Sequence, residues 1–234
     1  MKRLNIPSVQ DVSRIIGPSD SETVDALIKY YDGTAGNFNY SLSQKIARFV
    51  FTHQTTQEMY LQACVRERSK AGRAQNAEVL NFVWHAGAVR KSTSYELKPK
   101  VFPIRQDIQI KVNPAFYFVE NRKANIFWLQ PRRRFALNDT QLGLLASIIR
   151  MSYLVDDFQE VGLNLLDLSV PEGSTEREMK MFQLDSLPLV SIAETEALLQ
   201  RFARAYDTVC ASGLQRKQPK PKQPDADHDL FSPE

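Results

Sequence analysis

The sequence contains little cysteine, histidine or glycine, and each shortage excludes a class of protein. Only Cys64 and Cys210 occur, far apart and without the CxxC spacing of zinc or redox sites, so a disulfide scaffold is excluded. The 3 histidines are scattered along the chain, which argues against a multi-histidine metal site. With 9 glycines and 12 prolines among 234 residues, a collagen-like or wholly disordered chain is also excluded.

Long apolar runs are missing as well. No stretch approaches the roughly 18 consecutive apolar residues of a membrane-spanning helix, and the most apolar segment, 142–154, is interrupted by Arg150. The first seven residues include Lys2 and Arg3, but the apolar run of a secretory signal does not follow them. We therefore expect a cytoplasmic protein without a membrane partner.

Signature motifs of several enzyme classes do not occur. The sequence has no GxxxxGK[ST] phosphate loop, no GxGxxG after a predicted strand, no GxSxG elbow and no HExxH. Phosphate-loop, nicotinamide, serine-hydrolase and zinc-protease chemistry therefore have no support. Whether the protein is an enzyme stays open at this point, and the balance favours a protein that is not.

Positive charge is present, but it is concentrated in one segment. The whole chain has a formal charge of only +3, whereas residues 89–134 carry 11 basic and 3 acidic residues. Such a block creates a local field that suits phosphate groups. The candidate nucleic-acid contacts are Lys111, Arg122, Lys123, Arg132, Arg133 and Arg134. Alternatively, the arginines pair with an acidic loop that contains Glu172, Glu176, Glu178 and Asp185.

The first 88 residues read as a helical N-terminal region. Ser19 to Glu22 offer helix-capping residues ahead of an apolar stripe with helical spacing. Further helices are predicted over 41–50, over 56–69 and from 73 onward, the last of these leading into the next region.

Residues 89–211 read as an α/β (α+β) core with a mixed sheet. Strands are predicted over 89–97, over 107–112 resuming at 116–119 after a bend at Asn113-Pro114, over 124–129 and over 161–168. Because 124–129 is apolar on both faces, we predict a central strand that is covered on both sides. A helix is predicted from Asn138 and another from Ser191, with a loop over 170–186 between the last strand and the last helix.

The remaining segment, 212–234, differs in composition. It alternates lysine with proline and then turns acidic before Leu230 and Phe231. This composition predicts a disordered tail, whose apolar tip at Leu230 and Phe231 is a candidate docking element for a protein partner.

From residue 73 the predicted order is helix, three strands, helix, strand. Over 73–169 this order resembles the αβββαβ core of the restriction-endonuclease-like, PD-(D/E)xK, superfamily. The resemblance implies that two acids hold a divalent metal and that a lysine stabilises charge on phosphate. The corresponding positions here are Pro114-Ala115 and Gln130-Pro131-Arg132. Since Ala115 cannot bind a metal and Gln130 is a weak ligand, the resemblance implies a fold that is kept without its catalytic acids.

Three functions follow as hypotheses. The leading one is a nucleic-acid-binding, non-catalytic component of a DNA- or RNA-handling system, with no cofactor. The first alternative is a protein-interaction or scaffold module. The second alternative is a divergent nuclease that requires Mg²⁺, for which the candidate catalytic residues are Asp107, Glu120, Gln130, Arg132 and Asp167.

Overall fold

The computed structural model describes residues 3–33, 40–134, 136–155 and 158–214. The helices are α1 (Val9–Ile15), α2 (Asp20–Asp32), α3 (Ser41–Phe51), α4 (Gln57–Val65), α5 (Lys70–Gly87), α6 (Asp139–Tyr153), the 3-10 turn η2 (Leu184–Ser186) and α7 (Ile192–Ala211). The strands are β1 (Ser92–Tyr95), β2 (Lys100–Arg105), β3 (Ile108–Val112), β4 (Phe116–Glu120), β5 (Lys123–Gln130), β6 (Gly162–Asp167) and β7 (Lys180–Gln183).

These elements confirm the predicted α+β class. Within the described residues, no helix is long and apolar enough to cross a bilayer. The predicted tail lies outside the described residues from 215 onward, and so do Leu230 and Phe231.

A five-stranded mixed sheet forms the centre of the protein, in the order β1-β4-β5-β6-β7. β5 and β6 are parallel, and the other neighbouring pairs are antiparallel. The parallel pair is joined through α6, the helix that was predicted to begin after Asn138. In this register Gln130 lies opposite Asp167, so the two strands end side by side.

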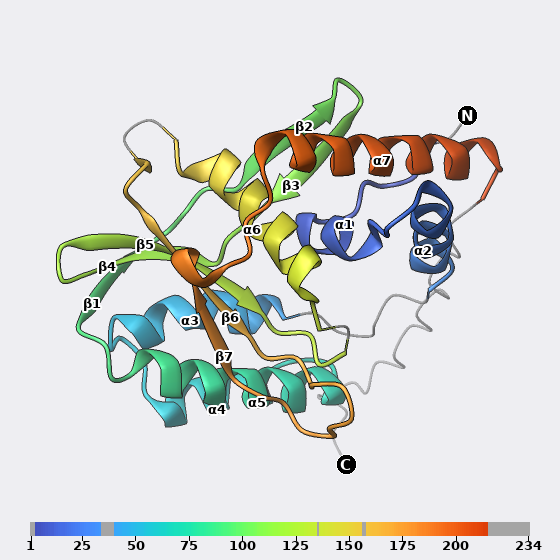
Figure 1. Ribbon diagram of the computed structural model, residues 1–234. Coiled ribbons are helices and arrows are strands. Elements are labelled where there is room, and N and C mark those ends of the chain that lie inside the picture. The colour runs from blue at the N-terminus through green and yellow to red at the C-terminus, as the bar shows by residue number, and fades with distance from the viewer. Residues whose placement is uncertain (1–2, 34–39, 135, 156–157, 215–234) are drawn as a thin grey trace, which may run out of the picture.

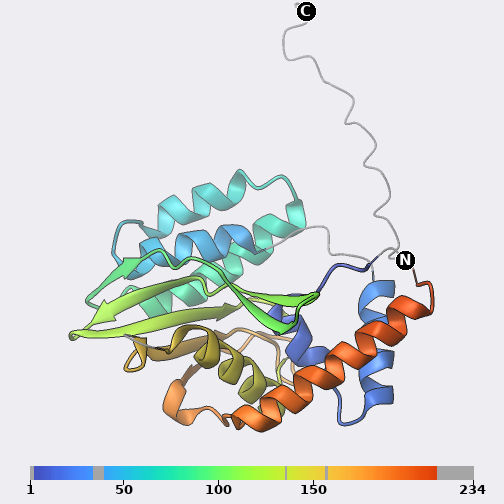
Figure 2. The same cartoon turned by 90° about the horizontal axis from the view of Figure 1, so that it is seen from above.

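Helices cover the sheet on both faces (Figures 1 and 2). On one face, Phe127 and Leu129 of β5 pack into an apolar cluster with residues of α3 and α5. On the other face, Ile126 and Trp128 pack into a larger cluster with residues of α1, α2, α6 and α7. β5 is therefore the doubly covered central strand that its sequence predicted.

Local capping explains where several helices begin. Asn138 accepts a hydrogen bond from the Gln141 backbone N–H, and the Gln141 side chain accepts one from the Asn138 backbone N–H, so α6 begins with the predicted capping box. Ser19 and Glu22 make the same reciprocal pair at α2. Both caps satisfy backbone donors that a helix N-terminus otherwise leaves unpaired.

Three parts of the sequence prediction were incomplete. Residues 107–112 do not continue into 116–119, because β3 pairs with the unpredicted β2 in a separate hairpin. The predicted loop over 170–186 contains β7 and η2. The short helix α1 was not predicted, because its seven residues are too few for the helical spacing of Val9, Val12 and Ile15 to stand out.

Gly143 marks a close approach between α6 and the segment before α7. A Cβ atom at this position would lie 2.0 Å from the Pro188 carbonyl oxygen. We predict that Gly143→Ala lowers the free energy of unfolding by about 1–3 kcal/mol in urea denaturation, although alanine is the better helix former. Thr140→Ala, on the exposed side of the same helix, serves as the control and should change it by less than about 0.5 kcal/mol. A more stable Gly143→Ala protein would contradict this packing.

Candidate functional site

The carboxyl ends of β5 and β6 carry a group of buried polar side chains. Gln130 and Asp167 end these strands and are 0% and 6% exposed. Side chains alternate along a strand, so Gln130 continues the face of Trp128, and Asp167 continues the face of Leu165. Ligands of open α/β sheets bind outside the carboxyl ends of parallel strands. The carboxyl ends of β5 and β6 are therefore the candidate functional site.

Helix α1 supplies the other members of this group. Ser8 caps the helix by accepting from the Asp11 backbone N–H, which places Asp11 in the first turn. Both oxygens of Asp11 accept from the Arg132 guanidinium, one of them at 3.0 Å. Arg14, one turn further along α1, lies 3.8 Å from the Asp11 carboxylate. We call Asp11, Arg14, Gln130, Arg132 and Asp167 the carboxyl-edge cluster.

Electrostatics within the cluster are finely balanced. The pKa of the Arg14 guanidinium is lowered to about 10, first because burial penalises its charged form and second because Arg132 repels it. Asp11 and Asp167 act in the opposite direction and stabilise the charged form. Buried charges are retained only where partners compensate for lost hydration. Groups held in this way are typical of functional sites.

Several buried donors on this side of the sheet have no acceptor among the described residues. They are the side-chain N–H groups of Gln10, Trp128 and Gln130, and their residues are at most 8% exposed. The Gln130 oxygen is used, because it accepts from the Arg132 backbone N–H at 3.2 Å. Unsatisfied buried donors are uncommon in native proteins.

On the opposite face of the same edge, Arg177 connects the β6–β7 loop to the sheet and to α5. Its side chain is 0% exposed and ion-pairs with Glu78 at 3.0 Å. It also donates to the carbonyls of Pro131 and Leu168, both at 2.7 Å. The hydroxyl of Tyr40 and the side-chain oxygen of Gln75 accept from its other nitrogen. Through the Pro131 carbonyl, Arg177 therefore fixes the backbone from which Arg132, Arg133 and Arg134 project.

Arg132, Arg133 and Arg134 follow β5 directly, and we call them the arginine edge. The Arg132 and Arg133 side chains are 43% and 42% exposed, and Arg134 is exposed. Arg132 is anchored by Asp11, while Arg133 lies 3.5 Å from Glu78 and donates to the Thr175 carbonyl. The guanidinium groups of Arg132 and Arg133 are thus held by partners and are also partly open to solvent.

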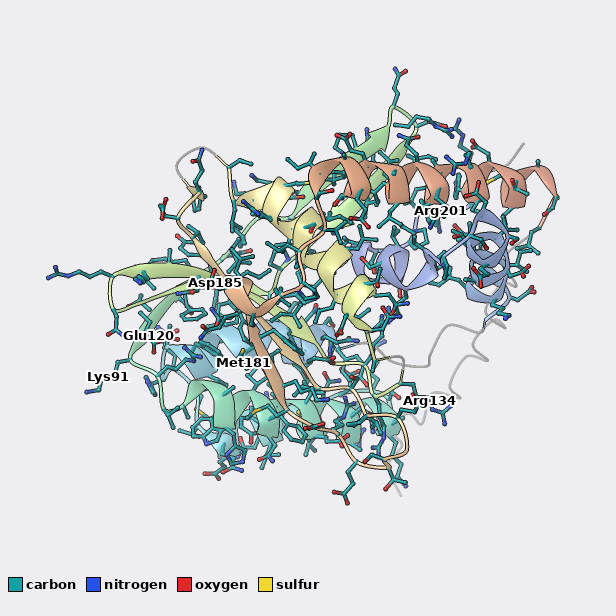
Figure 3. All side chains as sticks on the ribbon, in the orientation of Figure 1. Lys91, Glu120, Arg134, Met181, Asp185 and Arg201 are labelled. Atoms are coloured by element: carbon teal, nitrogen blue, oxygen red, sulfur yellow. The ribbon has the colours of Figure 1, made fainter. Side chains whose placement is uncertain are left out.

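The six predicted nucleic-acid contacts do not form one surface. Arg122 and Lys123 lie at the β4–β5 turn, and β5 separates Lys123 from Gln130 by about 23 Å at the usual rise per residue. Lys111 lies on β3, in the separate hairpin. Figure 3 shows Glu120, which ends β4 next to this turn, at the opposite end of the sheet from Arg134. Of the six predicted contacts, only Arg132, Arg133 and Arg134 lie beside the carboxyl-edge cluster.

The proposed catalytic acids are likewise divided. Glu120 lies opposite Lys123, at the far end of the sheet from Gln130, and ion-pairs with Arg90 at 2.7 Å. Asp107 lies in the β2–β3 turn, where Arg105 and Arg3 hold it. Hydrogen bonds from Arg105 are the main reason that its pKa lies below the usual range. Gln130, Arg132 and Asp167 lie together at the carboxyl ends of β5 and β6. Glu120 is too far from them to bind the same metal ion as Asp167.

By the resemblance, Ala115 and Gln130 correspond to the metal-binding acids of the superfamily, and Asp167 is the acid nearest to Gln130. Ala115 precedes β4 and donates its backbone N–H to the Phe127 carbonyl, beside β5. The Asp167 carboxylate accepts from the Ser169 backbone N–H at 2.9 Å. Among the described residues, no group of three or more His, Cys, Asp or Glu side chains is placed to hold a metal ion.

The expected acidic partners of the arginines differ from those observed. Arg132 and Arg133 pair with Asp11 and Glu78, both from the N-terminal helices, and Glu178 pairs with Lys180. Asp185 lies at the other end of the sheet, beside the start of β6. The sequence analysis missed Asp11, Arg14 and Arg177. The available signals were the capping pattern of Ser8 and Asp11 and the helical spacing of Val9, Val12 and Ile15.

Comparisons of the chain with protein-family models, with curated proteins and with solved structures found no match. The site is therefore interpreted from its own geometry.

Arg177 and Arg133 provide a matched test of burial, because both ion-pair with Glu78. Arg177→Met leaves two carbonyls and a carboxylate without their buried donor, and we predict a loss of about 3–5 kcal/mol in the free energy of unfolding. Arg133→Met removes an exposed pair and should cost no more than about 1 kcal/mol. Urea denaturation measures both. Equal losses would show that Arg177 does not hold this edge together.

Asp107 lines a hollow of 230 Å³ together with Arg3, Tyr206 and Cys210, and this neighbourhood predicts a pH effect. Burial is the main reason that the pKa of Tyr206 rises from 10.0 to about 12. Between these pH values the unfolded chain loses the tyrosine proton while the folded protein retains it, so stability falls as pH rises. We predict that thermal stability declines less steeply over this range in Tyr206→Phe than in the wild type. Parallel pH profiles would contradict the raised pKa.

Proposed function

We propose that this protein binds nucleic acid through the arginine edge, as a non-catalytic component of a DNA- or RNA-handling system in the cytoplasm. The observation that carries the proposal is the position of Arg132, Arg133 and Arg134. They project from the carboxyl end of the parallel pair β5–β6, where Asp11 holds Arg132 and Glu78 holds Arg133 with both side chains partly exposed.

The chemistry of the edge supports a phosphate ligand. Guanidinium groups bind phosphate oxygens in bidentate geometry, and pre-positioned arginines lose less side-chain entropy on binding. An anionic, oxygen-rich ligand therefore fits the arginine edge, whereas an apolar partner does not.

The resemblance to the restriction-endonuclease-like superfamily supports the same proposal. From α5 the chain continues through β1, β4, β5, α6 and β6, which is the αβββαβ order once the β2–β3 hairpin is set aside. Gln130 and Arg132 then occupy the (D/E)xK positions at the end of the third core strand. Ala115 and Gln130 stand where that superfamily has its metal-binding acids, which is why the proposed role is binding without cleavage.

A salt titration with matched charge variants tests the proposal. Fluorescence anisotropy of labelled single- and double-stranded DNA and RNA would be measured between about 50 and 300 mM salt, where counterion release sets the slope of affinity against salt. Arg133→Ala/Arg134→Ala should flatten that slope by about 1.8, since each phosphate contact contributes roughly 0.9. Arg132 is left in place because it pairs with the buried Asp11.

The control variant, Arg122→Ala/Lys123→Ala, removes the same charge at the other end of β5 and should preserve most of the slope. Equal flattening by both variants would show that overall charge, and not the arginine edge, governs binding. No binding at about 50 mM salt would contradict the proposal and favour an acidic protein partner. Incubation with Mg²⁺ or Mn²⁺ should leave the nucleic acid intact. Cleavage that Asp167→Asn abolishes would contradict the non-catalytic role.

A further inference from the structure

The carboxyl end of the parallel pair β5–β6 carries an excess of positive charge. Five guanidinium groups lie there against three carboxylates, so two positive charges have no carboxylate of their own. Like charges held close together favour the binding of a compensating anion. The guanidinium groups belong to Arg14, Arg132, Arg133, Arg134 and Arg177, and the carboxylates belong to Asp11, Glu78 and Asp167.

Arg134 is the most open member of this group. It is exposed, and it makes no ion pair within the described residues. The acids of the β6–β7 loop leave this charge in place, since Glu178 pairs with Lys180. In the part of the chain that the structure describes, Glu172 and Glu176 of that loop form no ion pair with an arginine. The excess charge therefore lies on the solvent side of the arginine edge, where an acidic segment has access to it.

The sequence after α7 contains an acidic segment of the required charge. Residues 225–229 read Asp-Ala-Asp-His-Asp, and we call them the acidic tip. They lie outside the described residues, so their contribution is argued from charge and chain length. The basic residues of the same tail all precede the tip, between residues 216 and 222. Three carboxylates therefore follow one another without a lysine or arginine between them.

Helix α7 ends within a short distance of the arginine edge. Tyr206, near the end of α7, donates a hydrogen bond to the Leu4 carbonyl. Seven residues further along the chain, Asp11 pairs with Arg132, and seven residues span at most about 25 Å. Figures 1 and 2 show α7 ending on the side of the molecule towards which β5 runs. The N-terminal segment thus connects the end of α7 to the arginine edge.

The tail is long enough to cover this distance. Leu214, the last described residue, packs against the larger apolar cluster, which also contains residues of α1. From Leu214 to Asp225 the chain advances by eleven residues, and it advances by fifteen to Asp229. An extended chain of these lengths spans up to about 36 Å and about 50 Å. The acidic tip therefore has the reach to contact the arginine edge while Leu214 keeps its place in the fold.

We propose that the acidic tip docks on the arginine edge of its own chain and competes there with nucleic acid for Arg133 and Arg134. The competition rests on the proposed function, whereas the docking itself does not. Carboxylates and phosphates bind guanidinium groups through the same charge-assisted hydrogen bonds, so one excludes the other. Because the tip is tethered, its effective concentration at the edge is in the millimolar range, and a weak contact is enough to occupy it. A dense row of phosphates displaces the tip, so docking disfavours weakly charged ligands.

NMR of the ¹⁵N-labelled full chain without nucleic acid tests the docking. At about 50 mM salt, the backbone amide signals of Ala226 and His228 should shift when Arg133→Ala/Arg134→Ala removes the partner charges. The control variant at the β4–β5 turn, described above, should leave both signals in place. Raising the salt to about 300 mM should produce the same shift in the wild type, because salt screens exposed charges. Identical Ala226 and His228 signals in the wild type and in Arg133→Ala/Arg134→Ala would overturn the proposal.

Nucleic-acid affinity of a tip variant tests the competition. Asp225→Asn/Asp227→Asn/Asp229→Asn should bind labelled single-stranded DNA about three- to tenfold more tightly than the wild type at about 50 mM salt. At about 300 mM salt, the two affinities should agree within about twofold. The matched control changes net charge equally at three exposed helix positions and should alter affinity by less than about twofold at either salt concentration. It is Asp25→Asn/Glu58→Gln/Glu196→Gln.

The two experiments separate this proposal from the proposed function. Equal gains in the tip variant and in its control would show that net charge governs affinity, and would overturn the competition. Unchanged affinity in the tip variant would overturn it as well, while nucleic-acid binding by the wild type would still support the proposed function. If no variant binds nucleic acid, the proposed function fails, and the Ala226 and His228 signals still decide whether the tip docks.

Discussion

The structure depends on the parallel pairing of β5 and β6, two strands that are apolar on both faces. Such strands are stable only when each face is covered, so the fold requires a helical layer on either side. α6 provides one layer as the crossover between the two strands, and the N-terminal helices α3 and α5 provide the other. The helical N-terminal region is therefore part of the same packed body as the sheet. Its residues Asp11 and Glu78 reach the arginine edge for this reason.

The polar ends of these strands follow from the same constraint. Apolar side chains fill the covered middle of β5, while Gln130 and Arg132 extend beyond it towards solvent. The edge stays partly buried because α1 and the β6–β7 loop close over it, so each charge there needs a partner. Asp11 neutralises Arg132, and Glu78 neutralises Arg177. The result is a set of arginines whose orientation is determined before any ligand binds, which lowers the entropic cost of binding.

The sequence revealed this frame where local signals were strong. The double-sided apolar run of β5, the capping box of α6 and the apolar run of β6 each specify an element without reference to the rest of the chain. β2 and β7 were missed because they are short and half-exposed, and β2 contains Pro103, which weakens a strand signal. α1 was missed because it has only seven residues, so the helical spacing of Val9, Val12 and Ile15 is repeated too few times to give a strong signal. These omissions hid the cluster, since Asp11 and Arg14 come from α1.

The basic segment shows why basic residues that are close in the sequence need not form one positively charged surface. Arg122 and Arg132 are ten residues apart, which would separate them by only about 15 Å along a helix. On an extended strand the same separation spans most of the sheet, so one run of positive charge supplies both ends of β5. At the β4–β5 turn, Glu120 pairs with Arg90, so part of the positive charge at this end of β5 has a carboxylate partner. At the other end, three consecutive arginines share only two acidic partners. The geometry of a single strand thus divides one charged segment into two chemically different edges.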